Sequence, residues 1–150
     1  MTQIEVNVAE ECPSVSVSTA AIATATGQLG RIIRIMDYPV AMAHKLAAWN
    51  ERNLVRDLYD LHFYYVFLKT LPNIYTLEER LKNIASTTRN KNPRSMTINE
   101  LLQKLRSTLQ NISDKDIHEL ADYLPAEDLP GLEMRLKANL LRLCDDIKQN

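Results

Sequence analysis

The sequence changes character near residue 38, and this change constrains the fold most, because strand-forming segments precede it and helix-forming segments follow it. Thr2–Val8 and Ser14–Ser18 alternate apolar and polar residues, as half-buried strands do. Three isoleucines in Arg31–Met36 favour another strand, because β-branched side chains suit a pleated sheet. We therefore expect about three strands within residues 3–36.

After this point the composition is typical of helices. Pro39 stands where the first turn of a helix tolerates proline, and the following residues are rich in Ala, Leu, Glu, Lys and Arg. The motifs Thr76-x-x-Glu79 and Thr97-x-x-Glu100 have the form of capping boxes. They predict two helices that begin at these places.

Two further helices are expected nearer the end of the chain. Asp114–Leu124 is followed by a proline, and leucines at helical spacing predict a long terminal helix. We expect an α+β fold, with a small N-terminal sheet followed by a helical bundle of about six helices. The length of 150 residues predicts a single domain 1–150, with strands in 1–37 and helices in 38–150.

Composition limits the kinds of partner and compartment. The formal net charge is −1, so the molecule as a whole lacks the basic excess that attracts nucleic acid or an anionic membrane. No apolar run approaches the roughly 20 residues of a membrane span, and no export segment is recognisable, which favours the cytoplasm. Cys12 and Cys144 lie far apart without metal-binding spacing, so both are interpreted as reduced thiols.

Charged residues follow a regular pattern on the first two expected helices. Lys45 and Arg52 are two turns apart on one face, while Asp57 and Asp60 lie along the flank of a leucine stripe on the next helix. If the two helices form a hairpin, Lys45 and the two aspartates face the same crevice. The alternative is that Arg56, Asp57 and Asp60 are solvated charges that form ordinary salt bridges on the surface of their helix.

The segment from Lys45 to Leu61, with an Arg-Asp-x-x-Asp-Leu helix preceded by strands, resembles the AbiEii/AbiGii nucleotidyltransferase toxins of abortive-infection toxin–antitoxin systems. The resemblance implies a nucleoside triphosphate, Mg²⁺ and an RNA acceptor. It implies that Lys45 contacts the triphosphate and that Asp57 or Asp60 supports the active site, so Lys45, Asp57 and Asp60 are the candidate catalytic residues. Arg52 and Arg56 are candidates for further phosphate contacts.

The chain also departs from the family pattern. Family members carry a Gly-rich turn followed by a strand with two metal-binding aspartates, whereas this chain has three glycines and no Asp-x-Asp in an expected strand. The resemblance covers the later half of the pattern, and residues 1–37 are interpreted as strands of a truncated core. Glu5 is the candidate for a remaining metal-binding carboxylate. Because two-metal transfer needs clustered carboxylates, we do not expect this chain to be active alone.

Two functional hypotheses follow. In the first, the chain is an AbiEii-like protein without its catalytic half, either a shortened relative or one part of a split enzyme. In the second, it is a non-catalytic helical module that binds an antitoxin or a separately encoded catalytic core. Exposed strand edges in residues 3–36 would favour pairing with a partner or a second copy of the chain.

Overall fold

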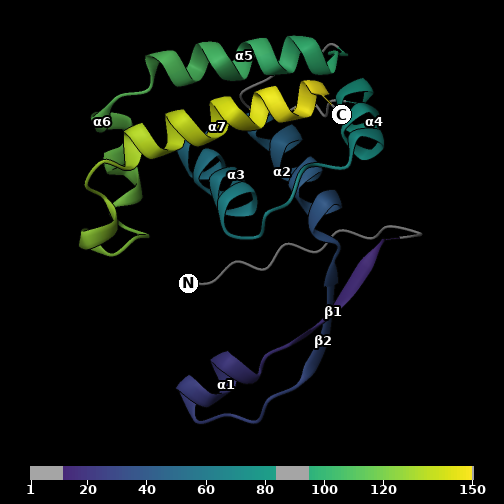
Figure 1. Cartoon of the computed structure of the whole chain (residues 1–150), viewed down its shortest axis with the longest axis vertical. Helices are drawn as coiled ribbons and strands as arrows, with labels where there is room; N and C mark the ends of the chain where they lie inside the picture. Colours follow the sequence, from purple (N-terminus) through teal and green to yellow (C-terminus); the bar gives the residue numbers. More distant parts are fainter. Residues whose placement is uncertain (1–11, 84–94, 150) are drawn as a thin grey trace. The chain divides into compact units, whose positions relative to one another are not determined.

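A computed structural model describes residues 12–83 and 95–149 of the chain. The chain divides into two compact units, residues 1–37 and 38–150, and the described residues of each are drawn in colour in Figure 1. The fold class is α+β, as the sequence predicts, with a small antiparallel sheet and a helical bundle. The strand expected over Thr2–Val8 lies outside the described residues, as does Glu5.

The first unit is a two-stranded antiparallel sheet with a short helix between its strands. β1 (Ser14–Ser18) pairs with β2 (Ile32–Met36), and α1 (Ala20–Thr26) connects them. α1 is rich in alanine, the residue with the highest helix propensity. Gly27 ends the helix with φ +65°, a left-handed conformation that favours glycine.

The second unit contains the six helices that the sequence predicts after residue 37. They are α2 (Tyr38–Arg52), α3 (Val55–Val66), α4 (Ile74–Lys82), α5 (Ile98–Asn111), α6 (Asp114–Ile117) and α7 (Leu132–Gln149). α7 packs against both α3 and α5, while α2 packs against α3 and α4 (Figure 1). None of the helices in the described ranges is both long and apolar enough to cross a membrane.

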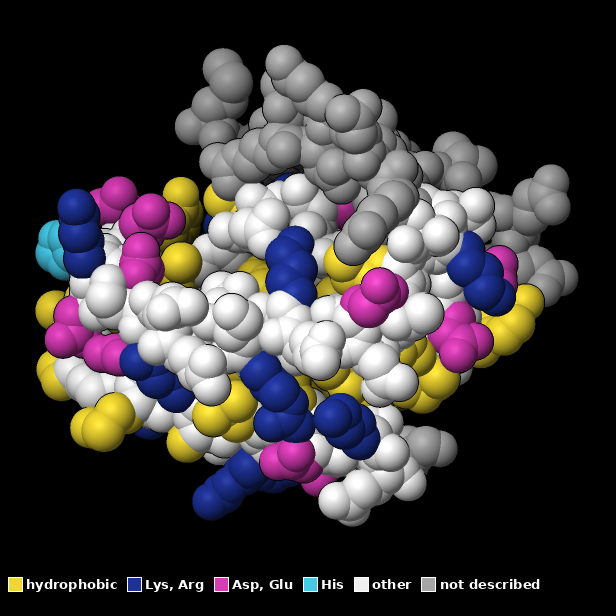
Figure 2. All heavy atoms as spheres, turned by 90° about the horizontal axis from the view of Figure 1, so that it is seen from above, with side chains coloured by type: hydrophobic (Ala, Val, Ile, Leu, Met, Phe, Trp, Pro, Cys, Tyr) yellow, Lys and Arg dark blue, Asp and Glu magenta, His cyan; other side chains and the backbone are white. Residues whose placement is uncertain are grey.

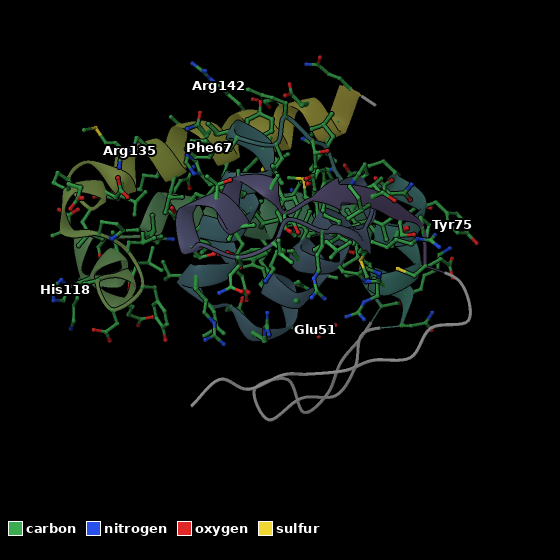
Figure 3. The ribbon with its side chains drawn as sticks, turned by 90° about the horizontal axis from the view of Figure 1, so that it is seen from below. Glu51, Phe67, Tyr75, His118, Arg135 and Arg142 are labelled. Atoms are coloured by element: carbon green, nitrogen blue, oxygen red, sulfur yellow. The ribbon has the colours of Figure 1, made fainter. Side chains whose placement is uncertain are left out.

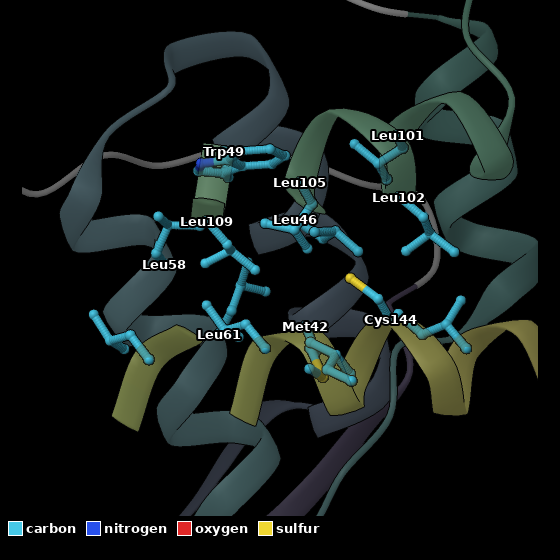
Figure 4. Close-up of a cluster of buried hydrophobic side chains, with 14 of the residues drawn as sticks. Met42, Leu46, Trp49, Leu58, Leu61, Leu101, Leu102, Leu105, Leu109 and Cys144 are labelled. Atoms are coloured by element: carbon cyan, nitrogen blue, oxygen red, sulfur yellow. The ribbon is translucent and has the colours of Figure 1, made fainter. Parts of the chain in front are cut away.

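One apolar core holds these helices together (Figure 4). Its members come from every helix of the second unit, and the largest fully buried side chains include Trp49, Met42, Leu46, Leu58, Leu61 and Leu105. Burial of each such side chain contributes about 1.5–3 kcal/mol to the free energy of folding, before the loss of conformational entropy is subtracted. Cys144 is part of this core, where burial raises the pKa of its thiol to about 11.

The helix boundaries confirm one of the two capping predictions, correct the other, and shorten one predicted helix. Thr97 and Glu100 form the expected capping box at α5. α4 begins earlier than predicted, because the side chain of Asn73 accepts a hydrogen bond from the Thr76 N–H. The helix expected over Asp114–Leu124 ends at Ile117 and continues as a 3₁₀ turn, His118–Leu120, whose backbone bonds span three residues.

Candidate charged site on the α2–α3 hairpin

A tight turn brings the charged faces of α2 and α3 together. Asn53, at the turn, has φ +54°, a left-handed conformation that asparagine tolerates better than most residues. The turn reverses the chain, so that α3 packs back along α2. Lys45 of α2 thereby reaches both Asp57 and Asp60 of α3. The hairpin geometry that the sequence suggested is therefore present.

Asp57 is the buried centre of this cluster. Its side chain is 1% exposed, and its Oδ1 accepts a hydrogen bond from Arg52 Nη2 at 2.7 Å. Lys45 Nζ lies 3.7 Å from the same oxygen. A buried carboxylate is tolerated only when it is paired and hydrogen-bonded, so these two cations offset its desolvation. Asp57 thus contacts the charged ends of two long side chains, Arg52 more closely than Lys45.

Asp60 occupies the solvent side of the cluster. Its Oδ2 lies 2.8 Å from Lys45 Nζ, and its side chain is 43% exposed. Tyr64 is one turn further along α3, and Tyr38 packs edge-on against it with ring centroids 6.4 Å apart. Burial raises the pKa of Tyr64, while the nearby Lys45 ammonium opposes the shift. Lys45 thus lies between two carboxylates and a neutral phenol.

Arg56 does not join the cluster, although it precedes Asp57 in the sequence. Its side chain is exposed and lines a different hollow, together with Glu119, Asp122 and Tyr123. Residues adjacent in a helix point about 100° apart, so Arg56 and Asp57 face different surroundings. Of the two arginines considered for phosphate contact, the structure brings only Arg52 to Lys45 and the aspartates.

Two further polar contacts on α2 were not anticipated. Glu51, nearly buried, pairs with Arg80 of α4 at 2.8 Å. Lys104 of α5 donates hydrogen bonds to the backbone oxygen and the side-chain oxygen of Asn50. These partners are 29 and 54 residues apart in sequence, so helical spacing carries no signal for either pair.

The cluster does not have the composition of a magnesium site. Mg²⁺ prefers octahedral oxygen ligands. Here Lys45 Nζ is already within 4 Å of both carboxylates, and Arg52 binds Asp57. Within residues 12–83 and 95–149, no group of three His, Cys, Asp or Glu side chains could hold a metal ion. The described residues therefore do not fit the metal that a nucleotidyltransferase needs.

The arrangement is better suited to anion binding through its cations. The side chains of Lys45 and Arg52 are 30% and 38% exposed, so part of each faces solvent. Both side chains also contact Asp57. An ammonium is a compact point charge, and a guanidinium presents several donors in a planar fork. On the face of the molecule that Figure 2 shows, charges of both signs are interspersed.

The described residues form an α+β fold in which a helical hairpin holds two partly exposed cations against a buried aspartate. A family model described as "Nucleotidyl transferase AbiEii toxin, Type IV TA system" matches residues 2–138. The chain belongs to this family, and its role is related to that of toxin–antitoxin nucleotidyltransferases. No curated protein and no solved structure matches the chain.

Proposed function

We propose that the α2–α3 hairpin binds the triphosphate of a nucleotide and that this chain is not active alone. The observation that carries the proposal is the attachment of Lys45 and Arg52 to buried Asp57. In this arrangement Lys45 and Arg52 contact phosphate oxygens. Charge-assisted hydrogen bonds to phosphate are about twice as strong as neutral ones, and fixed donors lose less entropy on binding.

The two aspartates have different roles in this proposal. Asp57 is a positioning residue, because it is buried and holds both cations. Asp60 is half-exposed and pairs with Lys45, so an incoming phosphate competes with it for the ammonium. Once displaced, the Asp60 carboxylate is free to accept a hydrogen bond from the ribose or base. Competition of this kind favours the triphosphate, whose charge is highest, over the monophosphate.

Turnover needs Mg²⁺ and carboxylates that the described residues do not supply. We propose that a separately encoded catalytic core provides them. Glu5 remains a candidate metal ligand outside the described residues. In a type IV toxin–antitoxin system, an antitoxin is the second partner expected for a chain of this family.

Calorimetric titration of ATP, GTP, CTP and UTP, each with Mg²⁺, tests the proposed nucleotide site. At least one nucleotide should bind to the parent chain, and Lys45→Ala should weaken its binding about tenfold, the value of one charge-assisted hydrogen bond. The absence of binding to all four nucleotides would contradict the proposal. Equal binding by the parent chain and Lys45→Ala would do so as well.

The exposed apolar side chains of the first unit favour a second function, in which the chain is a module that binds another protein chain. The short sheet and its connections expose several large apolar side chains, namely Ile22, Leu29, Ile32, Ile33 and Met36. A two-stranded sheet with such a surface is marginally stable unless something pairs with it or covers it. Its partner is an antitoxin, the separately encoded core or a second copy of the chain. Light scattering after size-exclusion chromatography tests this function, and a monomer without a co-purifying protein would contradict it.

A further inference from the structure

A buried histidine lies where α3 packs against α7. His62, on α3, is 5% exposed. Its ring contacts two aromatic neighbours, Tyr59 and Phe67, at centroid distances of 6.3 and 6.1 Å. Toward α7, its Nε2 lies 3.1 Å from Asn139 Nδ2. This hydrogen bond is a direct polar link between the two helices.

The surroundings of His62 suit a neutral imidazole. An amide nitrogen only donates, so Nε2 accepts from Asn139 and the ring proton is on Nδ1. Nδ1 is buried and has no hydrogen-bond partner among the described residues. A second proton would place an N–H at Nε2, facing the Asn139 amide group. Even if that amide turned to present its oxygen, the Nδ1–H would still lack an acceptor. An imidazolium therefore finds at most one of the two acceptors that it needs.

A fixed cation adds to this effect. Burial lowers the pKa of His62, and the Arg135 guanidinium lowers it further. Arg135, on α7, donates hydrogen bonds to the backbone oxygens of Asp128 and Pro130, which hold its charge in place. Figure 3 labels Arg135 and Phe67, two of the residues around His62.

The other charges around α3 do not compensate an imidazolium. In the described part of the chain, Arg135 is the charged group that shifts the pKa of His62. On α3 itself the titratable neighbour is Tyr59. The charged groups of the other elements packed on α3 are paired or exposed: Lys45 and Arg52 of α2 pair with Asp60 and Asp57, and His118 and Glu119 of the 3₁₀ turn are exposed.

We propose that protonation of His62 breaks the polar link between α3 and α7, so that the helical bundle loses stability in mildly acid solution. A protonated ring must leave its site to find hydrogen-bond acceptors in water, and its departure separates the two helices. α3 also carries Asp57 and Asp60, so the same event reduces nucleotide binding. Only this last consequence rests on the proposed function.

Urea unfolding of the whole chain at about pH 7.5 and about pH 5.5 tests the proposal. Because the pKa of His62 is lowered in the folded chain, its contribution to stability is complete above the unfolded pKa of about 6.5 and is lost as the pH falls below that value. The equilibrium constant for folding should fall by up to about tenfold more in the parent chain than in His62→Gln. Glutamine does not titrate, and its side-chain oxygen can accept from Asn139.

The comparison has internal controls. Burial also lowers the pKa of His44, but His44 is present in both chains, so the difference between them isolates His62. His118→Gln is the matched control, because His118 is an exposed histidine. It should keep the pH dependence of the parent chain.

Asn139→Asp is a second variant with the opposite expected sign. A carboxylate at this position accepts a hydrogen bond from the protonated Nε2 and should raise the pKa of His62 above its unfolded value. The contribution of His62 is then complete below the unfolded pKa and is lost as the pH rises through the folded pKa. The folding constant of this variant, relative to that of the parent chain, should therefore rise as the pH falls.

Nuclear magnetic resonance of the ring nitrogens measures protonation directly. His62 should remain neutral in the folded chain at about pH 6, below the pKa of an ordinary histidine. A doubly protonated His62 ring under these conditions would overturn the proposal. Equal pH dependence of the parent chain and His62→Gln would overturn it too, as would an Asn139→Asp variant that follows the parent chain. If His62→Gln does not fold, Asn139→Asp and the ring spectra decide. None of these readouts uses a nucleotide, so failure of the nucleotide site is distinguishable from failure of this proposal.

Discussion

Asp57 shows how one residue can organise a charged cluster. Its position on the flank of the leucine stripe, and its proximity to Lys45, follow from helical spacing and a hairpin. Its near-complete burial does not follow, because burial depends on how closely α2 and α3 approach. The sequence therefore suggests two equivalent aspartates, whereas the structure separates a buried Asp57 from a half-exposed Asp60.

Substitution of each aspartate by asparagine should separate their roles in stability. Asp57→Asn removes the counter-charge of Arg52 and Lys45 at a buried position, and we expect a loss of about 2 kcal/mol in the free energy of unfolding. Asp60→Asn alters an exposed pair and should cost less than about 1 kcal/mol. Urea unfolding measures both values. Equal losses, or a larger loss for Asp60→Asn, would refute the distinction.

At the scale of the helices, the sequence pattern predicts the start of α5 correctly but places the start of α4 too late. Thr97 caps α5 as its motif predicts. The similar motif at Thr76 is already inside α4, because Asn73 provides the cap three residues earlier. Asparagine is itself a preferred N-cap residue, so Asn73, directly after Pro72, is also a helix-start signal. Asn73 donates its backbone N–H to the Pro39 oxygen, a contact that spacing does not predict.

The cap assignment makes a prediction at the N-terminus of α4. Asn73→Ala should lower the free energy of unfolding by about 1 kcal/mol, because it removes the acceptor of the Thr76 N–H. Thr76→Ala should cost less, since Thr76 contributes only its backbone to this cap. Thermal unfolding followed by circular dichroism compares the two variants. A larger effect of Thr76→Ala would restore the sequence-based cap.

Contacts between helices set the limit of what the sequence predicts about the site. Lys45, Asp57 and Asp60 are predictable because two neighbouring helices and one short turn suffice to bring them together. The pairing of Glu51 with Arg80 and of Asn50 with Lys104 requires the packing of α4 and α5 against α2. Arg56 is the reverse case, because it adjoins Asp57 in the sequence but lines a different hollow.

At the scale of the whole molecule, stability is concentrated in the second unit. All residues of the main apolar core lie between Met42 and Ile147. Among the described residues of the first unit, Ala23 is the single buried apolar residue. The two-stranded sheet has too small a core to fold independently.

A fragment of residues 38–150 should therefore fold alone. We expect cooperative unfolding in urea, with a free energy of unfolding within about 1 kcal/mol of the whole chain, because the core is retained. A fragment of residues 1–37 should show no cooperative transition. Loss of cooperativity in the longer fragment would show that its core depends on the first unit.

The central claim is that the α2–α3 hairpin recognises a triphosphate through Lys45. The most direct test compares the affinities of a nucleoside triphosphate and its uncharged nucleoside for the parent chain, Lys45→Ala and the control Arg56→Ala. Lys45→Ala should weaken triphosphate binding about tenfold and leave nucleoside binding unchanged, whereas Arg56→Ala should change neither. An equal effect of the two substitutions, or equal loss for triphosphate and nucleoside, would contradict phosphate recognition by Lys45.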